Sequence, residues 1–472
     1  MTRALTAFRR STALAAALIL AGCATVDPER QFAPVQQAAQ QHTGATLRWA
    51  RSDEERTAID QQVATLLATA PLAADAAVQL ALLNHRGLQA RFAALGVAEA
   101  EVVQALRLPN PGFTFGRSRT GDEREIDRSL HLPLLRWLLT PWTGDLAQRR
   151  LDRERHAVLV AVLDHAAKTR KAWVDAVAAQ QSVHYMGQVM QAAEAAAELA
   201  RRMQQVGNFS PLQRAREQAF YADAALNVAR AEQQQRATRE RLTRLLGLWG
   251  AQTAFTLPDR LPDLPAELPE RPQIEREALA TRLDLQAAQI AVDETARALG
   301  LTRATRLVSV VELGLSHNTS SDGSRQRGWE VGIELPIFDP GDAKAARADA
   351  VWHQAVDQAA QLAIDARSQI REAEGQRRSA WQIARHHRDQ IVPLRAQIAE
   401  QNVLRYNGML IGVFELLADA RAQIASVHDA ILAERDFWLA DADLRMATLG
   451  SPTPSALAGP MSSTGGGDAG GH

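Results

Sequence analysis

The sequence predicts a mainly α-helical protein that carries two pairs of β-strands and is built from one unit repeated twice. Two stretches of roughly sixty residues, 145–206 and 342–406, contain little glycine or proline, which favours long helices. Residues 307–335 instead alternate between apolar and polar side chains, the pattern of a β-hairpin. The pattern of residues 81–95 returns at 278–292, which indicates an internal duplication.

The chain begins with a segment that resembles a bacterial lipoprotein signal. Basic residues precede an apolar run over 13–20, which ends at Leu20-Ala21-Gly22-Cys23. We therefore expect residues 1–22 to be a signal peptide and Cys23 to be the lipidated first residue of the mature chain, with palmitate among its acyl groups. Cys23 is the only cysteine among 472 residues, so a disulfide within the chain is excluded. The alternative is an ordinary buried cysteine beside a signal peptide that is cleaved elsewhere.

Composition is that of a helical protein with much water-exposed surface. Hydrophobic residues make up 46% of the chain, charged residues 23% and aromatic residues 5%. Lysine and arginine total 53 against 54 acidic residues, giving a formal net charge of -1. Without a basic excess, we expect no nucleic-acid partner.

Three segments of the chain lie outside the repeats. Residues 23–73 are polar and glutamine-rich, and we expect an extended lead with one helix near 53–67. Residues 251–273 form a connector, because the proline-rich run within them cannot be helical. The glycine- and serine-rich residues 451–472 are expected to be a disordered tail.

The duplication sets the domain boundaries at residues 74–250 and 274–450. Each copy predicts the same order: a helix of about 30 residues, a strand, a polar loop, a return strand, a Gly-Asp turn, a long helix, a second turn and a returning helix. The equivalent segments are Leu88-Gln89-Ala90 and Leu285-Gln286-Ala287, polar loops at 119–125 and 318–327, Gly144-Asp145 and Gly341-Asp342, and long helices from 145 and 342.

Helix lengths predict how each copy folds. A helix of sixty-odd residues is about 90 to 100 Å long. The returning helix of about 35 residues and the earlier helix of about 30 together match that length, so they can stack end to end beside it. The antiparallel pair would bury its shared face as a coiled coil. Its alanine-rich faces would allow the two helices to pack at a short distance. Pro393 predicts a local kink in the second long helix.

The strands have the length and alternation of strands that cross a bilayer. Each is about ten residues long, with one apolar face and one polar face. Glu312, Glu330 and Glu334 share the polar positions. A sheet in lipid has to close into a barrel, because open edges leave backbone groups unpaired. The alternative is a half-buried hairpin packed on helices in water.

The whole order of elements resembles the outer membrane efflux protein family, the TolC-like exit ducts. The resemblance covers about residues 75 to 449. Its residues are Leu108-Pro109-Asn110-Pro111, Arg282-Leu283-Asp284-Leu285, 335–341, and Tyr406-Asn407-Gly408 with 413–421. It implies a homotrimer with a helical tunnel and a twelve-stranded transmembrane β-barrel. It also implies an outer membrane location with a large periplasmic part, and two partners: a periplasmic adaptor and an inner membrane pump.

From this resemblance we expect the exit channel of a tripartite efflux system, a passive conduit for small toxic solutes such as drugs or metal ions. An exit duct for type I protein secretion would share these features. A periplasmic coiled-coil adaptor or structural lipoprotein is an alternative of another class. The sequence has no Walker glycine motif, nucleophile elbow or HExxH helix, so we expect no enzyme, cofactor or metal site.

The family resemblance singles out Glu415 as a candidate for the periplasmic gate. It aligns with an acidic residue that forms a ring at the closed mouth of the family's trimers, where three like charges repel. The sequence departs from the family three residues later, where Ala418 replaces a second acid and Asp419 is shifted by one. The alternative is a solvated helix carboxylate.

The resemblance also assigns roles to the two turns between the long and returning helices. We expect these tips to contact the adaptor through Gly207, Asn208, Phe209 and Ser210 in the first copy and Gly408, Met409 and Gly412 in the second. Glu312, Glu330 and Glu334 are expected to face the lumen of the barrel. In a soluble hairpin these glutamates would only occupy the solvent-facing positions of the strands.

Overall fold

The computed structural model describes residues 27–307 and 310–450. They fall into two compact units. The strand unit comprises the described residues of 27–35, 90–158 and 285–363, and the hairpin unit comprises 36–89, 159–284 and 364–450. The expected lipidation site at Cys23 and the expected tail at 451–472 lie outside the described residues.

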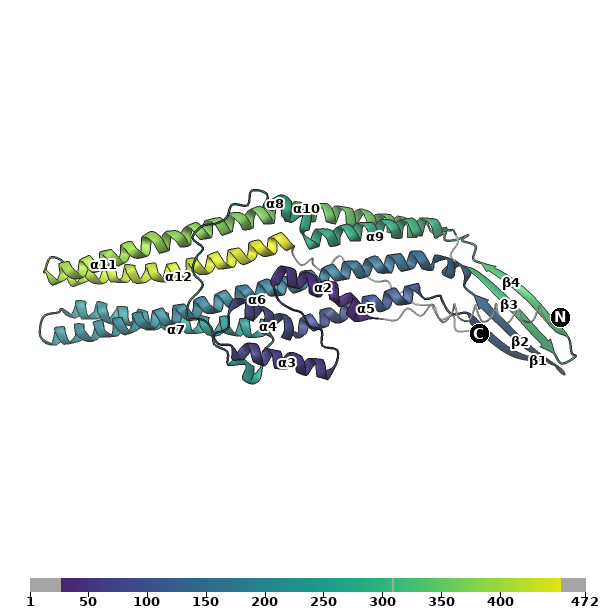
Figure 1. Cartoon of the computed structure of the whole chain (residues 1–472), viewed down its shortest axis with the longest axis horizontal. Coiled ribbons are helices and arrows are strands. Elements are labelled where there is room, and N and C mark those ends of the chain that lie inside the picture. Colours follow the sequence, from purple (N-terminus) through teal and green to yellow (C-terminus); the bar gives the residue numbers. More distant parts are fainter. Residues whose placement is uncertain (1–26, 308–309, 451–472) are drawn as a thin grey trace. The chain divides into compact units, whose positions relative to one another are not determined.

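The two copies contain the same series of elements (Figure 1). The lead and first copy contain α2 (Pro28–Thr43), α3 (Asp53–Ala68), α4 (Ala74–Asn84), α5 (Arg86–Leu106), β1 (Gly112–Thr120), β2 (Glu123–Leu132), α6 (Leu134–Gln205), α7 (Pro211–Leu246) and a short 3-10 turn, η1 (Gly250–Thr253). The second copy contains α8 (Ile274–Thr281), α9 (Leu283–Thr305), β3 (Val311–Ser320), β4 (Arg325–Ile333), α10 (Asp342–His386), a π-helical turn η2 (His387–Ile391), α11 (Val392–Asn407) and α12 (Val413–Leu449).

The helix expected before each strand pair is broken at the same place in both copies. His85 separates α4 from α5, and Arg282 separates α8 from α9. Each lies three residues before the matching Leu-Gln-Ala segment and has an extended backbone, with ψ of 114° and 125°. The expectation of one continuous helix was therefore wrong, whereas the shared break supports the duplication.

The lead contains one helix more than the sequence indicated. The expected helix near 53–67 is confirmed as α3, which Ser52 and Glu55 begin with a capping box. The unpredicted helix is α2, which contains Pro34. Its Phe32 packs edge-on against Phe92, with ring centroids 4.9 Å apart. The extended lead was therefore wrong for this stretch, because tertiary packing stabilises a helix of weak local pattern.

The long helix of the first copy starts earlier than predicted. It begins at Leu134, so the expected turn at Gly144-Asp145 lies inside α6. A Cβ at Gly144 would come within 2.4 Å of the Leu106 side chain, so close packing on α5 explains this glycine. In the second copy the turn is confirmed, because Gly341 has φ of 73° and α10 starts at Asp342.

The four strands form one antiparallel sheet within the strand unit, in the order β1-β2-β3-β4 (Figure 1). The polar runs 119–125 and 318–327, which we expected to be loops, are mostly strand. Only Gly121 and Asp122 lie between β1 and β2, and Gly121 has the positive φ, 65°, that such a tight turn requires. The alternation of side chains between the two faces of the sheet continues through these charged residues.

Where Pro393 predicted a local kink, the structure has a change of helix type. The five residues before Val392 form the π-helical turn, and Val392 donates its N–H to the His387 carbonyl five residues earlier. Proline has no N–H to donate, and its ring crowds the preceding turn. A π turn relieves this conflict without ending the helix.

The hairpin unit holds the main hydrophobic core. Side chains of α3, α4, α6 and α7 meet there, with Leu80, Val177 and Leu242 fully buried. The indole of Trp173 in this core donates to the Leu72 carbonyl at 2.8 Å. Small residues such as Ala193 and Ala224 bring α6 and α7 together further along. In the described part of the chain, no helix combines the length and apolar character needed to cross a membrane.

The predicted connector has no helix over its proline-rich run and is held along the hairpin unit. Leu257, Leu261 and Leu264 are buried. Two indoles bind its backbone: Trp381 donates to the Pro265 carbonyl and Trp438 to the Pro262 carbonyl, both at 3.0 Å. Proline carbonyls remain good acceptors, so the connector is fixed by side chains instead of secondary structure.

Candidate functional site

The sheet of the strand unit separates its charged side chains by sign. Residues paired across antiparallel strands share a face, so the register assigns every strand position. One face, named the acidic face, consists of Gly112, Thr114, Gly116, Ser118, Thr120, Glu123, Glu125, Asp127, Ser129, His131, Glu312, Gly314, Ser316, Asn318, Ser320, Gln326, Gly328, Glu330 and Gly332. It carries carboxylates and no Arg or Lys.

The predicted carboxylates lie together on this face. Glu312 pairs with Gly332, and Gly314 pairs with Glu330. A Cβ at Gly314 would stand 2.5 Å from the Glu330 side chain, so the glycine leaves room for that carboxylate. Glu334 follows Gly332 at the next position of the alternation, directly after β4. His131 of β2 lies 3.8 Å from Glu330, close enough to pair with it when protonated.

Sequence reasoning missed three further acids of this face. Glu123, Glu125 and Asp127 lie on β2 and share the face with Glu312. Glu123 and Glu125 belong to the run 119–125, which was interpreted as a polar loop, and Asp127 was not singled out. The signal was nevertheless present, since Glu123, Glu125 and Asp127 alternate with arginine and isoleucine.

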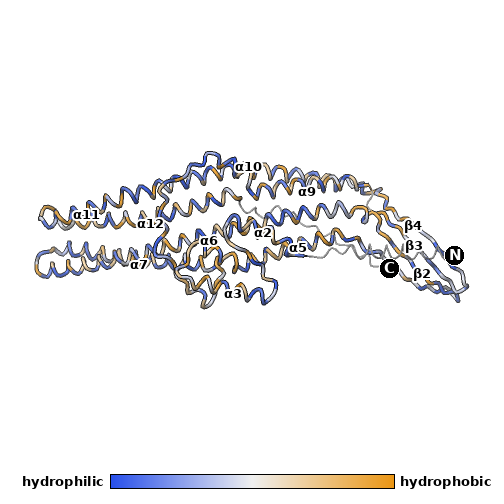
Figure 2. Tube along the Cα trace, in the orientation of Figure 1, coloured by the Kyte–Doolittle hydropathy of each residue, from blue (hydrophilic) through white to orange (hydrophobic). Residues whose placement is uncertain are grey.

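The opposite face, named the apolar face, presents large exposed hydrophobic side chains. Phe113 is 67% exposed, Trp329 76% and Ile333 56%. In Figure 2 the strands alternate between hydrophobic and hydrophilic colours along their length. A contiguous apolar surface of this kind marks an interface with lipid or protein.

The two tips of the hairpin unit share one backbone motif. At the first tip Asn208 donates to the Met203 carbonyl at 2.8 Å and Gly207 to that of Gln204 at 3.0 Å, the two bonds of a Schellman motif. Gly207 occupies the left-handed position with φ of 82°. Ser210 then caps α7 in a capping box with Gln213. The predicted N-cap is thus confirmed.

At the second tip the left-handed residue is not the glycine. Leu410 donates to Arg405 and Met409 to Tyr406, both at 2.9 Å, so Met409 takes the position that Gly207 has in the first tip. Met409 has φ of 58°, whereas Gly408 has φ of -80°. Met409 is the only non-glycine residue with positive φ in the described part of the chain, and the conformation costs about 1 to 2 kcal/mol.

Both tips also expose apolar side chains. Val206 is 71% exposed and Leu212 62% at the first tip, and Met409 is 94% and Leu410 73% at the second. Phe209 is half-buried, while Asn208 and Gly412 are exposed. Exposed apolar groups at the ends of helical hairpins are suited to a protein contact.

Glu415 lies in the first turn of α12 with an exposed side chain. The N-cap Gly412 has no side chain to satisfy the free N–H groups, so a carboxylate here also favours the helix. Asp419 is engaged elsewhere, because it accepts a hydrogen bond from the buried Asn402 of α11. Asp419 therefore serves the α11–α12 pair instead of forming a second free acid.

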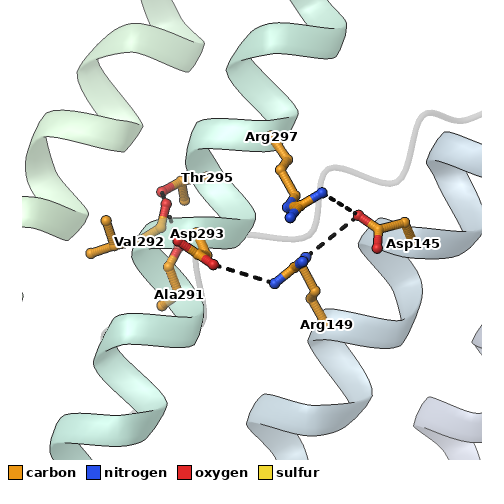
Figure 3. Close-up of polar contacts among 7 residues, drawn as sticks. All are labelled: Asp145, Arg149, Ala291, Val292, Asp293, Thr295 and Arg297. Carbon is orange, nitrogen blue, oxygen red and sulfur yellow. Dashed lines mark hydrogen bonds and ion pairs between the residues drawn. The ribbon is translucent and has the colours of Figure 1, made fainter.

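Ion pairs join the two copies within the strand unit (Figure 3). Asp145 of α6 lies 3.4 Å from Arg149 and 3.3 Å from Arg297 of α9, and Arg149 also reaches Asp293 of α9 at 3.4 Å. These four side chains, with alternating charge, form one ion-pair network between α6 and α9. A network of this kind fixes the register of α6 against α9 more than an isolated exposed pair does.

A second group of ion pairs between the same two helices is more buried. Glu294 of α9 is 7% exposed and accepts from Arg150 at 3.0 Å and from Arg153 at 2.7 Å. Two arginines compensate the buried carboxylate. In the described residues, no group of three or more His, Cys, Asp or Glu side chains is arranged to hold a metal ion.

No protein-family model and no curated protein matches this sequence. Solved structures do resemble it. A membrane protein from Pseudomonas aeruginosa superimposes with a TM-score of 0.69 and 20% identity, over 79% of this chain and 92% of that chain. The CmeC outer membrane channel of Campylobacter jejuni gives 0.68 and 16% over 85% and 89%. The outer membrane protein VceC of Vibrio cholerae gives 0.67 and 16% over 83% and 97%.

The chain therefore has the fold of these outer membrane proteins, which is the TolC-like fold that its sequence predicted. The predicted fold class, mainly helical with four β-strands per chain, is confirmed. The resemblance spans most of this chain and most of each compared chain.

Proposed function

We propose that this protein is the outer membrane exit channel of a tripartite efflux system, a passive conduit for small toxic solutes. The TolC-like fold supports a channel of this class. The observation that carries the proposal is the division of the sheet into an acidic, glycine-rich face and an apolar face. One face suits a water-filled lumen and the other suits lipid.

The sheet also has two open edges, β1 and β4. Unpaired backbone groups are costly in lipid, so a single copy is incomplete. We infer a homotrimer in which β1 of each copy pairs with β4 of the next, closing twelve strands around an acidic lumen. Glu312, Glu330 and Glu334 would line it, and three copies of the helical hairpins would enclose the periplasmic tunnel.

The adaptor would bind at the tips. Gly207, Asn208, Phe209 and Ser210 form the proposed contact in the first copy, and Gly408, Met409 and Gly412 form it in the second. The exposed apolar side chains beside them support this role. Cysteines placed at the tips should crosslink to the cognate adaptor, which in turn binds the inner membrane pump. Crosslinks formed only by cysteines far from the tips would contradict the assignment.

Two further roles follow from the family resemblance. Glu415 would form a ring of three carboxylates at the periplasmic mouth, where their repulsion biases the mouth toward opening or cation binding. Cys23 would anchor the chain in the outer membrane by its acyl chains. Replacing Cys23 by alanine should abolish incorporation of labelled palmitate.

A type I secretion duct and a periplasmic adaptor or structural lipoprotein remain the alternatives. The secretion duct differs in its partners, so copurification with an adaptor and an efflux pump or with a secretion ATPase separates the two. The adaptor alternative explains the helical hairpins but not a sheet with an exposed apolar face.

Planar-bilayer recording of the detergent-purified chain, with its native mass measured in parallel, tests the proposal. A trimer that produces discrete, steady openings is the expected result. A water-soluble species that never conducts would overturn it and favour the adaptor class.

A further inference from the structure

All six arginines of the four strands lie on the apolar face. They are Arg117, Arg119, Arg124, Arg128, Arg325 and Arg327. The strands contain no lysine, and every strand carboxylate lies on the acidic face. The sheet thus carries positive charge on the face that also carries its hydrophobic side chains.

The arginines are confined to one part of this face. Counting pairs from the tight turns, Arg119 pairs with Arg124, Arg117 with Ile126, and Phe115 with Arg128. The next pairs are apolar, beginning with Phe113 and Leu130. On β3 and β4 the order is the same.

In that second hairpin, Thr319 pairs with Arg325 and His317 with Arg327. Leu315 with Trp329, Leu313 with Val331 and Val311 with Ile333 follow. We name the arginine part, next to the turns, the arginine belt, and the remainder the apolar band. Same-face neighbours along a strand are about 7 Å apart, so the belt is roughly 14 Å deep and borders the band directly.

Most of the belt is not neutralised within the chain. Arg119 donates to the Gly121 carbonyl at 2.9 Å and lies 3.7 Å from Asp122. In the part of the chain that the structure describes, Arg117, Arg325 and Arg327 are exposed and form no ion pair, and Arg128 is half-buried without one. The strand acids cannot reach them, because they lie on the other face.

We propose that the arginine belt binds phosphate groups of anionic lipid head groups whose acyl chains cover the apolar band. This inference rests on the proposed function, because it needs the apolar face to lie in the bilayer. Guanidinium groups bind phosphate oxygens in a bidentate manner, which favours Arg over Lys. Basic side chains at a membrane surface are attracted to anionic lipid head groups, by about 1 kcal/mol for each Lys or Arg.

Adjacency to the apolar band is what identifies a lipid. A soluble phosphate would satisfy the arginines but leave Phe113, Leu315 and Trp329 uncovered. A lipid with a phosphorylated head group satisfies both parts at once. The belt would then fix the depth of the strands, since moving it inward would bury arginines in the hydrocarbon layer.

The test compares the full-length trimer with two triple variants. The first replaces Arg117, Arg128 and Arg327 by glutamine. The second, a control with the same change of charge, replaces the exposed helical arginines Arg244, Arg347 and Arg371 by glutamine. Each protein is reconstituted in vesicles of phosphatidylcholine alone, with phosphatidylglycerol, or with lipid A, and retained lipid is counted by native mass spectrometry.

We expect wild type and control to retain phosphatidylglycerol and lipid A over phosphatidylcholine. In the belt variant this preference should fall by at least about tenfold, while the variant still conducts. Equal retention by the belt variant overturns the inference. Displacement by inorganic pyrophosphate alone would assign the belt to soluble phosphate and also overturn it. A wild type that neither inserts nor conducts means instead that the proposed function has failed.

Discussion

Arg282 and Asp284 form a bidentate ion pair that is completely shielded from solvent, with both side chains at 0% exposure. The guanidinium reaches the carboxylate at 3.0 and 2.6 Å, and it also donates to the Ala447 carbonyl at 2.7 Å near the end of α12. One side chain thus ties the break between α8 and α9 to the last helix of the hairpin unit.

Replacing Asp284 by alanine should destabilise the protein strongly, by about 3 to 5 kcal/mol, because the buried Arg282 charge loses its partner. The double variant Arg282→Met with Asp284→Leu should lose much less free energy of unfolding, since no buried charge is left. Thermal unfolding of the detergent-solubilised proteins measures both. Equal losses in the two variants would contradict an ionic role.

His165 should make the hairpin unit sensitive to acid. Burial, and secondarily the nearby His85, lower the pKa of His165 from 6.5 to about 4. Between these pH values the unfolded chain therefore binds more protons than the folded chain. The contribution of His165 to the free energy of unfolding is fully present above about pH 6.5, and it is lost as the pH falls toward 4, by up to about 3 kcal/mol.

His165 also contacts the Leu245 carbonyl at 2.9 Å. His165→Gln keeps a hydrogen-bond donor at this position but does not titrate, so its stability should vary less over this range. His184→Gln, at an exposed site on the same helix, is the control and should keep the wild-type profile. Identical pH profiles for all three proteins would refute the assignment.

Met409→Gly should relax the second tip. Glycine adopts the left-handed conformation without steric cost, although it loses more entropy on folding, so the net gain is about 1 kcal/mol at most. Slower hydrogen exchange over residues 405–412 is the expected signal. Leu410→Gly, next to the strained position, should give no protection. Faster exchange in Met409→Gly would show that the methionine side chain stabilises the turn.

Glu312 and Glu330 are expected to set the ion preference of the proposed channel. Replacing both by glutamine should lower its preference for cations by about twofold, because carboxylates in a narrow lumen concentrate cations. Reversal potentials in a salt gradient measure this. The matched control is Arg128→Gln with Arg327→Gln on the opposite face, which should leave the preference unchanged. The proposal fails if the two double variants shift the preference equally.

Glu415→Gln should lengthen the closed times of the proposed channel and reduce its cation preference, since the proposed ring of like charges is removed. The helix itself should lose only about 0.5 kcal/mol from its N-terminus. Glu400→Gln, an exposed site on α11, serves as control. Single-channel records of Glu415→Gln that match the parent would exclude a gating role and leave Glu415 only the role of stabilising the N-terminus of α12.

Local patterns predicted the parts of the fold that depend on local chemistry. The alternation that carries Glu312 and Glu330 is visible in a few residues, and the register assigned them to one face. The N-cap at Ser210 and a helix irregularity at Pro393 were also predictable, because each depends on its own backbone chemistry.

Features that depend on distant partners could not be predicted in this way. Arg282 meets the Ala447 carbonyl 165 positions away, and Glu294 meets Arg150 across 144 positions. The left-handed position at the second tip was also not apparent, since Gly408 offered a less strained choice. The Cys23, Glu415 and tip assignments remain predictions.

The two equivalent breaks, at His85 and Arg282, are stabilised by different chemistry. His85 stacks on His165 with ring centroids 4.1 Å apart, whereas Arg282 is held by a carboxylate and a carbonyl. Protonation of both rings turns the first contact into a repulsion between cations, whereas the second joins opposite charges. The break in the first copy therefore depends on two neutral imidazoles, so acidification below the lowered pKa values of His85 and His165 should loosen the contact between α4 and α6.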